Sequence, residues 1–284
     1  MPQEDDNGQP EATASLLSFF GSRVLRLRTE RGWSQQELAT KAHATGAMIS
    51  YVENAKRVPS ADLAADLDRA FGTDFFEEFL PFVIRYAYPG WFLPYVELEA
   101  QASSIRAFDG QVVSGLLQTE GYARAVAESG RPDRVEPLVA ARMTRQAIFE
   151  REDRPRAWFI LDENALTRPL GGPAVMRAQL ARLLEVGEEP RTVIQVLPRT
   201  VVSHPGLDGS FTLLSFGQGE NPKTGNRRPP HDVLYVDGFS RGRTALDEAE
   251  VTYAGHAYDL LRGYALSPQE SAGLIRRHME ELAK

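Results

Sequence analysis

The residues best suited to bind a polyanion lie between positions 34 and 60. Lys56 and Arg57 are adjacent cations that can neutralise phosphates. Gln35 follows a predicted helix start, where backbone amides and the helix dipole favour an anion. Residues 14–72 hold eight Lys or Arg and six Asp or Glu, a net charge of +2 in a chain of net charge −7. This distribution favours a nucleic-acid-binding segment; the alternative is that Lys56 and Arg57 are solvated surface charges.

Residues for catalysis are scarce in this chain. It has no Cys, which excludes disulfides, thiolate metal sites and a Cys nucleophile. Its five histidines form no H-E-x-x-H pair, and neither a nucleophile elbow nor a P-loop is present. Beyond residue 72 the lysines are Lys223 and Lys284, which do not suit a Ser–Lys dyad, and Asp162-Glu163 equally well caps a helix. We therefore predict no enzyme activity, no metal site and no cofactor.

Helices must position the residues around position 35. Apolar residues at helical spacing predict a first helix over 15–31, which Gly32 ends. Ser34 and Glu37 form an S-x-x-E capping box, in which the hydroxyl and the carboxylate each satisfy a backbone N–H. A second helix is thus predicted to begin at Ser34 and to end near Ala42.

Two more helices complete the predicted N-terminal domain. Thr45 is the expected N-cap of the third, and the fourth is predicted to start at Pro59-Ser60 and to end at Gly72. The connection between the second and third helices is only a few residues long, which is the helix-turn-helix arrangement. A small helical bundle with another role is the alternative.

The segment Arg23–Ser60 resembles the Xre/Cro-type repressor family. The matching residues are Arg26 to Glu30, Ser34-Gln35, Glu37-Leu38-Ala39, Ile49-Ser50, Glu53-Asn54, Lys56-Arg57 and Pro59-Ser60. The segment departs from the family at His43 and Ala55, where Gly is common, and at Trp33, where a smaller apolar residue is usual. The resemblance implies a lambda-repressor-like fold that binds double-stranded DNA.

In helix-turn-helix proteins the N-terminal residues of the third helix face base edges in the major groove. Here Gly46 and Ala47 are too short for bidentate hydrogen bonds, whereas Ser50 and Tyr51 offer polar contacts. The predicted DNA-binding residues are Gln35, Thr45, Gly46, Ala47, Ser50, Tyr51, Asn54, Lys56 and Arg57. One of Arg23, Arg26 and Arg28 is expected to be structural and to pair with Glu53 or Glu37.

The remainder of the chain divides into three predicted segments: a disordered acidic tail (1–13), a linker helix (73–88) and an α+β domain (89–284). A membrane-surface helix is the alternative for 73–88, but that segment lacks a basic polar face. In the α+β domain, helices are predicted near 90–102, 119–129, 134–152, 173–186, 245–262 and 268–282. Strands are predicted at 157–162, 192–197, 211–216 and 232–236, and residues 217–231 are predicted to form a long mobile loop.

The α+β domain resembles the C-terminal domain of antitoxin-like actinobacterial regulators of the WhiJ type. The similar residues are Ser114–Ala125, Arg142, Arg145-Gln146, Leu161-Asp162-Glu163, Ala165-Leu166, Val196-Leu197-Pro198 and Gly209-Ser210-Phe211. The resemblance implies self-association as a homodimer and a small partner protein of the BldB type.

The interpretation that results is a two-domain transcriptional regulator, most simply a repressor. An all-α helix-turn-helix domain (14–72) is predicted to read DNA, and the α+β domain to dimerise and to receive a signal. A small-molecule sensor is the alternative, with aromatic residues such as Trp91, Phe92, Tyr95, Trp158 and Phe159 lining a pocket. No signal peptide and no apolar run of about 18 residues is found, so we expect a cytoplasmic, nucleoid-associated protein without membrane contact.

Overall fold

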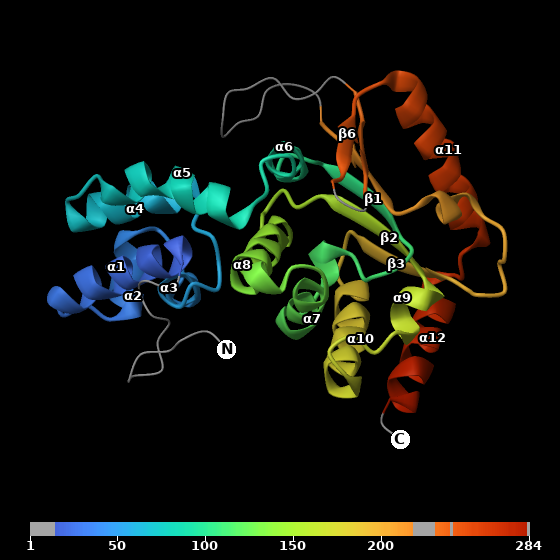
Figure 1. Ribbon diagram of the computed structural model, residues 1–284, viewed down its shortest axis with the longest axis horizontal. Coiled ribbons are helices and arrows are strands. Elements are labelled where there is room, and N and C mark those ends of the chain that lie inside the picture. The colour runs from blue at the N-terminus through green and yellow to red at the C-terminus, as the bar shows by residue number, and fades with distance from the viewer. Residues whose placement is uncertain (1–14, 218–230, 239–240, 283–284) are drawn as a thin grey trace. The chain divides into compact units, whose positions relative to one another are not determined.

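The computed structural model describes residues 15–217, 231–238 and 241–282 (Figure 1). The chain forms two units. Unit 1 consists of the described residues up to Gly90 together with Arg131–Thr144, and unit 2 consists of Trp91–Gly130 together with the described residues from Arg145 onward. The predicted acidic tail (1–13) and nearly all of the predicted loop (217–231) lie outside the described residues.

Unit 1 is helical. Its helices are α1 (Leu16–Glu30), α2 (Gln35–Lys41), α3 (Gly46–Glu53), α4 (Ala61–Phe71), α5 (Phe75–Ala87) and α8 (Val135–Arg145) up to Thr144. At the start of each of the first four helices, a side-chain hydroxyl accepts a hydrogen bond from a backbone N–H of the first turn. These hydroxyls belong to Ser15, Ser34, Thr45 and Ser60. Their apolar faces meet in a core that includes Phe20, Leu38, Ile49, Leu67 and Phe76. The predicted N-terminal helical domain is confirmed.

Two helices outside the predicted DNA-binding domain (14–72) also pack within unit 1. Helix α5, in the segment predicted as a linker, contacts α1 and α4 and buries Phe76. In α8, the Thr144 hydroxyl accepts the Val58 backbone N–H at 2.8 Å, and the Tyr88 hydroxyl donates to the Ala141 carbonyl at 3.1 Å. A helix that follows unit 2's first strand in the sequence therefore supports the chain just after Arg57.

Unit 2 is built on a six-stranded mixed sheet of order β3-β2-β1-β4-β5-β6. The strands are β1 (Ser104–Asp109), β2 (Arg156–Asp162), β3 (Thr192–Leu197), β4 (Phe211–Ser215), β5 (Val233–Val236) and β6 (Arg243–Ala245). Strands β1, β2 and β3 pair in parallel, and β4, β5 and β6 continue the sheet in antiparallel pairing. Strand β1 is therefore central, between the parallel and the antiparallel halves.

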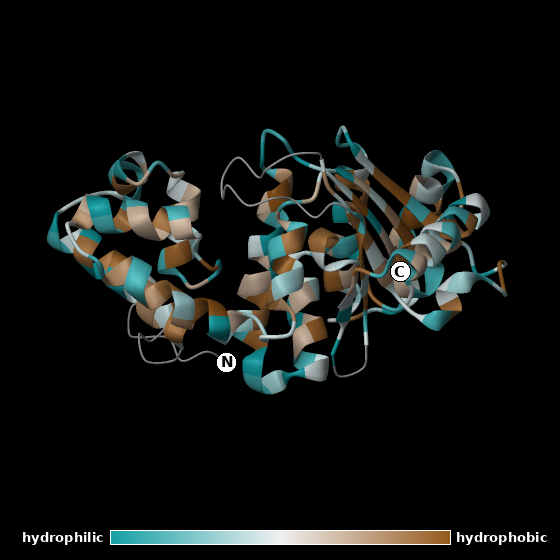
Figure 2. Cartoon of the chain, turned by 90° about the horizontal axis from the view of Figure 1, so that it is seen from above, coloured by the Kyte–Doolittle hydropathy of each residue, from teal (hydrophilic) through white to brown (hydrophobic). Residues whose placement is uncertain are grey.

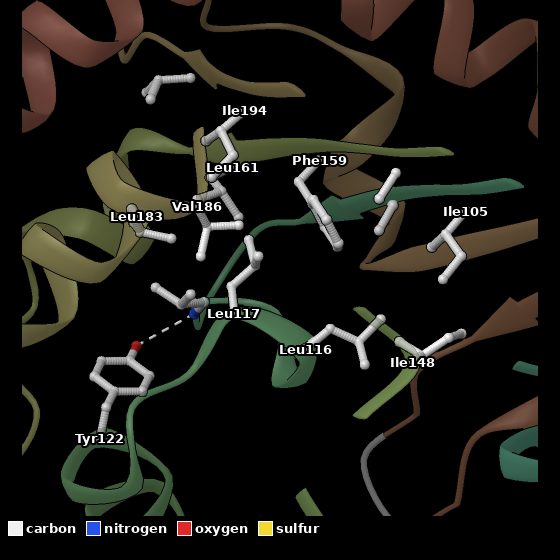
Figure 3. Close-up of a cluster of buried hydrophobic side chains, with 14 of the residues drawn as sticks. Ile105, Leu116, Leu117, Tyr122, Ile148, Phe159, Leu161, Leu183, Val186 and Ile194 are labelled. Atoms are coloured by element: carbon white, nitrogen blue, oxygen red, sulfur yellow. Dashed lines mark hydrogen bonds between the residues drawn. The ribbon is translucent and has the colours of Figure 1, made fainter. Parts of the chain in front are cut away.

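Alternate residues of strands β1 to β5 enter two cores, one on each face of the sheet. On one face, Ile105 and Phe159 pack with α10 (Pro173–Gly187) and α12 (Pro268–Glu281). On the other face, Phe108 and Ile160 pack with α11 (Glu248–Tyr264). The shorter helices of unit 2 are α6 (Leu93–Glu99), α7 (Glu120–Gly130) and α9 (Glu163–Thr167). Figure 3 shows part of the first core, where the Tyr122 hydroxyl accepts the Val113 backbone N–H at 3.2 Å.

The predicted α+β class is confirmed, and so are the four predicted strands. Strands β1 and β6 were not predicted. Strand β1, with the sequence SIRAFD, mixes polar and charged residues with apolar ones, so it lacks the continuous apolar run of a typical buried parallel strand. The predicted helix over 90–102 is shorter than expected because the chain turns into β1 after Glu99.

A buried ion pair joins α6 to the end of α8 within unit 2. Arg145 donates two hydrogen bonds to the Glu99 carboxylate, each 2.7 Å long, and the Tyr95 hydroxyl donates a third of 2.7 Å. Burial, followed by the charge of Glu99, holds the pKa of Tyr95 well above its usual value, so this hydroxyl stays protonated. The Arg145 guanidinium lies 5.0 Å from the Phe92 ring centroid and 5.6 Å from that of Tyr95. The charges are thus both paired and packed.

We expect Arg145→Ala to lower the free energy of unfolding by about 3–5 kcal/mol, because it leaves the Glu99 carboxylate buried without its cation. Chemical denaturation monitored by circular dichroism would measure the change. Arg182→Ala is the matched control, since it breaks an exposed pair with Glu185 and should cost less than about 1 kcal/mol. Equal losses in the two variants would contradict the importance of the Glu99–Arg145 pair.

Candidate nucleic-acid interface

A buried carboxylate on α3 ties together the three helices that form the predicted reader. Glu53, only 6% exposed, accepts hydrogen bonds from Arg28 Nε at 2.5 Å and Nη2 at 3.1 Å. Gln35 Nε2 donates to the same carboxylate at 2.7 Å, and Arg28 Nη1 donates to the Trp33 carbonyl at 2.7 Å. Arg28 is therefore the structural arginine that the sequence predicted, and its partner is Glu53.

Gln35 has a structural contact that sequence reasoning missed. Its side-chain amide is directed to Glu53, so an anion at the start of α2 would meet backbone amides there. The start itself is the predicted capping box: Ser34 N–H donates to Glu37 at 2.7 Å and Glu37 N–H donates to the Ser34 hydroxyl at 3.1 Å. The hydrogen bonds from the Ser34 backbone and hydroxyl hold the pKa of Glu37 below its usual value.

Helix α3 has one buried face and one outward face. Ile49 and Val52 are buried in the core of unit 1. The predicted contact residues that are exposed are Thr45, Ala47, Tyr51 and Lys56, whereas Gly46, Ser50, Asn54 and Arg57 are half-buried. The structure therefore brings the predicted base-facing residues together on the solvent side of α3, with Lys56 and Arg57 just beyond its end.

Several of these side chains have partners within unit 1. The Thr45 hydroxyl accepts the Met48 N–H at 3.1 Å, and Asn54 Nδ2 donates to the Ser50 carbonyl at 2.8 Å. The Arg57 guanidinium lies 5.0 Å from the centroid of the Tyr51 ring. This cation–π contact holds Arg57 and Tyr51 side by side at the same end of the helix.

One glycine allows two of the helices to approach closely. A Cβ on Gly21 would lie 2.3 Å from the Val52 carbonyl oxygen, so α1 can cross α3 only because this residue has no side chain. A Cβ on Gly46 would lie 2.9 Å from Gln36 Oε1, the end of an exposed and flexible side chain that can move aside. Gly46 is therefore not required for the packing of α3 on α2.

The turns that end α2 and α3 adopt left-handed backbone conformations at non-glycine residues. His43 has φ of 48° and Ala55 has φ of 55°, and these are the two positions where the Xre/Cro resemblance expects Gly. The N–H groups that follow bond back across each turn, from Ala44 to the Ala39 carbonyl at 2.9 Å and from Lys56 to the Tyr51 carbonyl at 2.8 Å. These are Schellman-type helix ends, and each carries backbone strain.

In unit 2, the residues that suggested other chemistry are held in structural contacts. Asp162 caps α9 by accepting the Asn164 N–H at 2.8 Å, and Glu163 accepts the Arg199 N–H at 2.8 Å. Burial opposes ionisation of Glu163, but the hydrogen bonds from Arg199 outweigh it, so the pKa of Glu163 is lowered. Among the described residues, no cluster of His, Asp and Glu has the arrangement of a metal site.

The aromatic residues proposed for a small-molecule pocket pack against other side chains. Tyr95 and Phe159 are buried in the core of unit 2. The Tyr95 and Tyr235 ring centroids are 4.1 Å apart, and the Phe92 ring lies against both, at 5.4 Å from Tyr95 and 5.8 Å from Tyr235. No described helix is both long and apolar enough to span a membrane.

Unit 1 has the helix arrangement of a DNA-binding regulator of the helix-turn-helix class. Comparison with family models supports that class, since residues 20–77 match a family described as "Helix-turn-helix domain". Residues 92–277, more than half of the chain, match the family described as "Domain of unknown function (DUF5753)", so the protein belongs to that family. No curated protein and no solved structure matches the chain.

We expect Ala55→Gly to raise the free energy of unfolding by about 0.5–1 kcal/mol, since glycine removes the left-handed strain but gains flexibility in the unfolded chain. Thermal unfolding followed by circular dichroism would measure it. Ala65→Gly, a substitution inside α4, is the control and should instead lose about 1 kcal/mol. A loss of stability in both variants would contradict the assignment of strain to Ala55.

Proposed function

We propose that this DNA-binding regulator recognises a specific operator through α3 and acts as a repressor. The observation that carries the proposal is the outward face of α3, which ends in the Tyr51–Arg57 pair and Lys56. Residues 14–72 form the reader in this proposal, and residues 89–284 form the regulatory and dimerisation domain. The resemblance to WhiJ-type regulators supports a small BldB-type protein as the source of the regulatory signal.

Contacts with the bases are few in this proposal. Ala47 packs on a thymine methyl group, Ser50 donates or accepts one hydrogen bond, and Tyr51 reaches a neighbouring base. The backbone amides at the start of α2, together with Lys56 and Arg57, hold phosphates on either side of the groove. Thr45 and Asn54 add neutral contacts to the backbone. A reader with so few base contacts depends on DNA shape and on a second copy for its selectivity.

A homodimer would supply the second reader. Two copies related by a two-fold axis place their recognition helices in major grooves about 34 Å apart, or a multiple of that distance. The operator is therefore expected to be a palindrome with half-sites spaced by whole turns of DNA. Nothing in this proposal requires catalysis.

Selection of binding sites from genomic fragments with the purified full-length protein tests the proposed specificity. We expect enrichment of one palindromic sequence, and loss of that enrichment in the Ser50→Ala/Tyr51→Phe double variant, which keeps Lys56 and the aromatic ring beside Arg57. Sequence-specific recognition of DNA by α3 would be contradicted if the double variant still enriched the same sequence. It would also be contradicted if the unaltered protein enriched no sequence.

The phosphate contacts can be tested separately from the base contacts. Lys56→Ala or Arg57→Ala should weaken binding to all duplexes alike, and each should reduce the slope of log affinity against log salt by about one. Fluorescence anisotropy at several salt concentrations, with operator and unrelated duplexes, measures both effects. A loss confined to the operator would instead assign that residue to base recognition.

A further inference from the structure

Helix α11 carries apolar side chains on two of its sides, and the described residues of unit 2 cover only one of them. Ala257, Tyr258 and Leu261 pack into the core on that side of the sheet. Beside that side of the helix, next to Ala257, Tyr253 is 68% exposed and Leu260 is 53% exposed. Figure 1 shows α11 at the outside of the sheet, and no described element of unit 2 covers these two side chains. Large apolar groups gathered on one exposed helix face mark an interaction surface.

The exposed face has the spacing of a helix-packing seam. Its residues are Ala249, Tyr253, His256, Leu260 and Gly263, which follow one another at alternating intervals of four and three. This is the heptad spacing with which one helix packs along another. We call these five residues the α11 seam. The helix has 17 residues, and the seam extends along it for about 21 Å.

The ends of α11 carry opposite charges. Its first turn holds Glu248 and Glu250, and its last turn holds Arg262. An antiparallel pair of such helices brings the acidic end of each against the basic end of the other, and it also opposes their dipoles favourably. Within the chain, Glu250 is paired with Arg243 at 2.8 Å and Arg262 lies 3.5 Å from Asp259, so the added attraction is modest.

The seam is also complementary to itself in size. In an antiparallel pair with a two-fold axis close to His256, Tyr253 faces Leu260 of the partner subunit, and Leu260 faces the partner's Tyr253. In this register Ala249 lies opposite the partner subunit's Tyr264, which neighbours the seam residue Gly263. The two-fold axis repeats each of these contacts, as an isologous interface requires.

We propose that the α11 seam is the homodimer interface, occupied by the α11 of a second copy in antiparallel orientation. The proposal rests on the proposed function only in that two readers are needed for a palindromic site. A competing surface exists on α5 in unit 1, where Phe79 contacts Phe75, Phe82 and Phe19, with ring centroids 5.2, 6.0 and 5.4 Å apart. Phe82 on that surface is exposed, so it provides a matched control.

Sedimentation equilibrium of the full-length protein without DNA tests the interface. Leu260→Glu buries an unpaired carboxylate against Tyr253 of the partner subunit at both ends of the seam, and it should raise the dimer dissociation constant by about 100-fold or more. Phe82→Glu should leave the dimer intact. A monomeric unaltered protein, a dimer that tolerates Leu260→Glu, or dissociation by Phe82→Glu alone would overturn the proposal. Circular dichroism confirms that each variant is folded.

Disulfide cross-linking tests the orientation, because the chain has no Cys of its own. A mixture of Tyr253→Cys and Leu260→Cys proteins should form the mixed disulfide dimer on mild oxidation, at a yield several-fold above that of either variant alone. Arg182→Cys, on α10 at the other face of the sheet, should not cross-link. Absence of the mixed dimer, or preferential linkage within each single variant, would overturn the antiparallel arrangement. Since DNA is absent, failure of DNA selection leaves this result unaffected.

Discussion

Glu53 lies on the inward side of the recognition helix, where an unpaired carboxylate would cost several kcal/mol. Three hydrogen bonds from Arg28 and Gln35 satisfy it, and these donors come from the two helices that flank α3. The carboxylate therefore sets the orientation of α3 relative to both neighbours. With the inner face held in this way, the residues on the outer face of α3 keep one arrangement toward DNA.

In unit 2, a second buried carboxylate is also satisfied by hydrogen bonds from neighbouring side chains. The Glu99 carboxylate is buried and accepts two bonds from Arg145 and one from Tyr95. Arg145 follows Thr144, whose hydroxyl accepts the N–H of Val58 in unit 1, so one helix contributes to both units at consecutive residues. Because a charge pair in a protein core has strict geometry, the C-terminal end of α8 is positioned by specific partners rather than by apolar packing alone.

Structural features could be predicted from the sequence where the interactions that stabilise them join residues close together in the chain. The capping box at Ser34 and Glu37 appears as predicted because both hydrogen bonds close within four residues. Apolar strands such as β2 were predicted because β-branched and aromatic residues fit a covered sheet. Strand β1 was missed because its burial comes from partners distant in sequence, β2 on one side and β4 on the other, which the polar segment SIRAFD does not reveal.

By itself, the sequence determined the helix-turn-helix, the α+β class and the outward position of the predicted base-facing residues of α3, since helical periodicity decides which side of that helix is apolar. Only the tertiary structure decided that Arg28 rather than Arg23 or Arg26 reaches Glu53, and that Gln35 joins it. It alone placed α5 and most of α8 in unit 1, and it showed that no described element of unit 2 covers Tyr253 and Leu260 of α11. These contacts form between segments that are far apart in the sequence. They are therefore determined by long-range packing and not by the local spacing of residues.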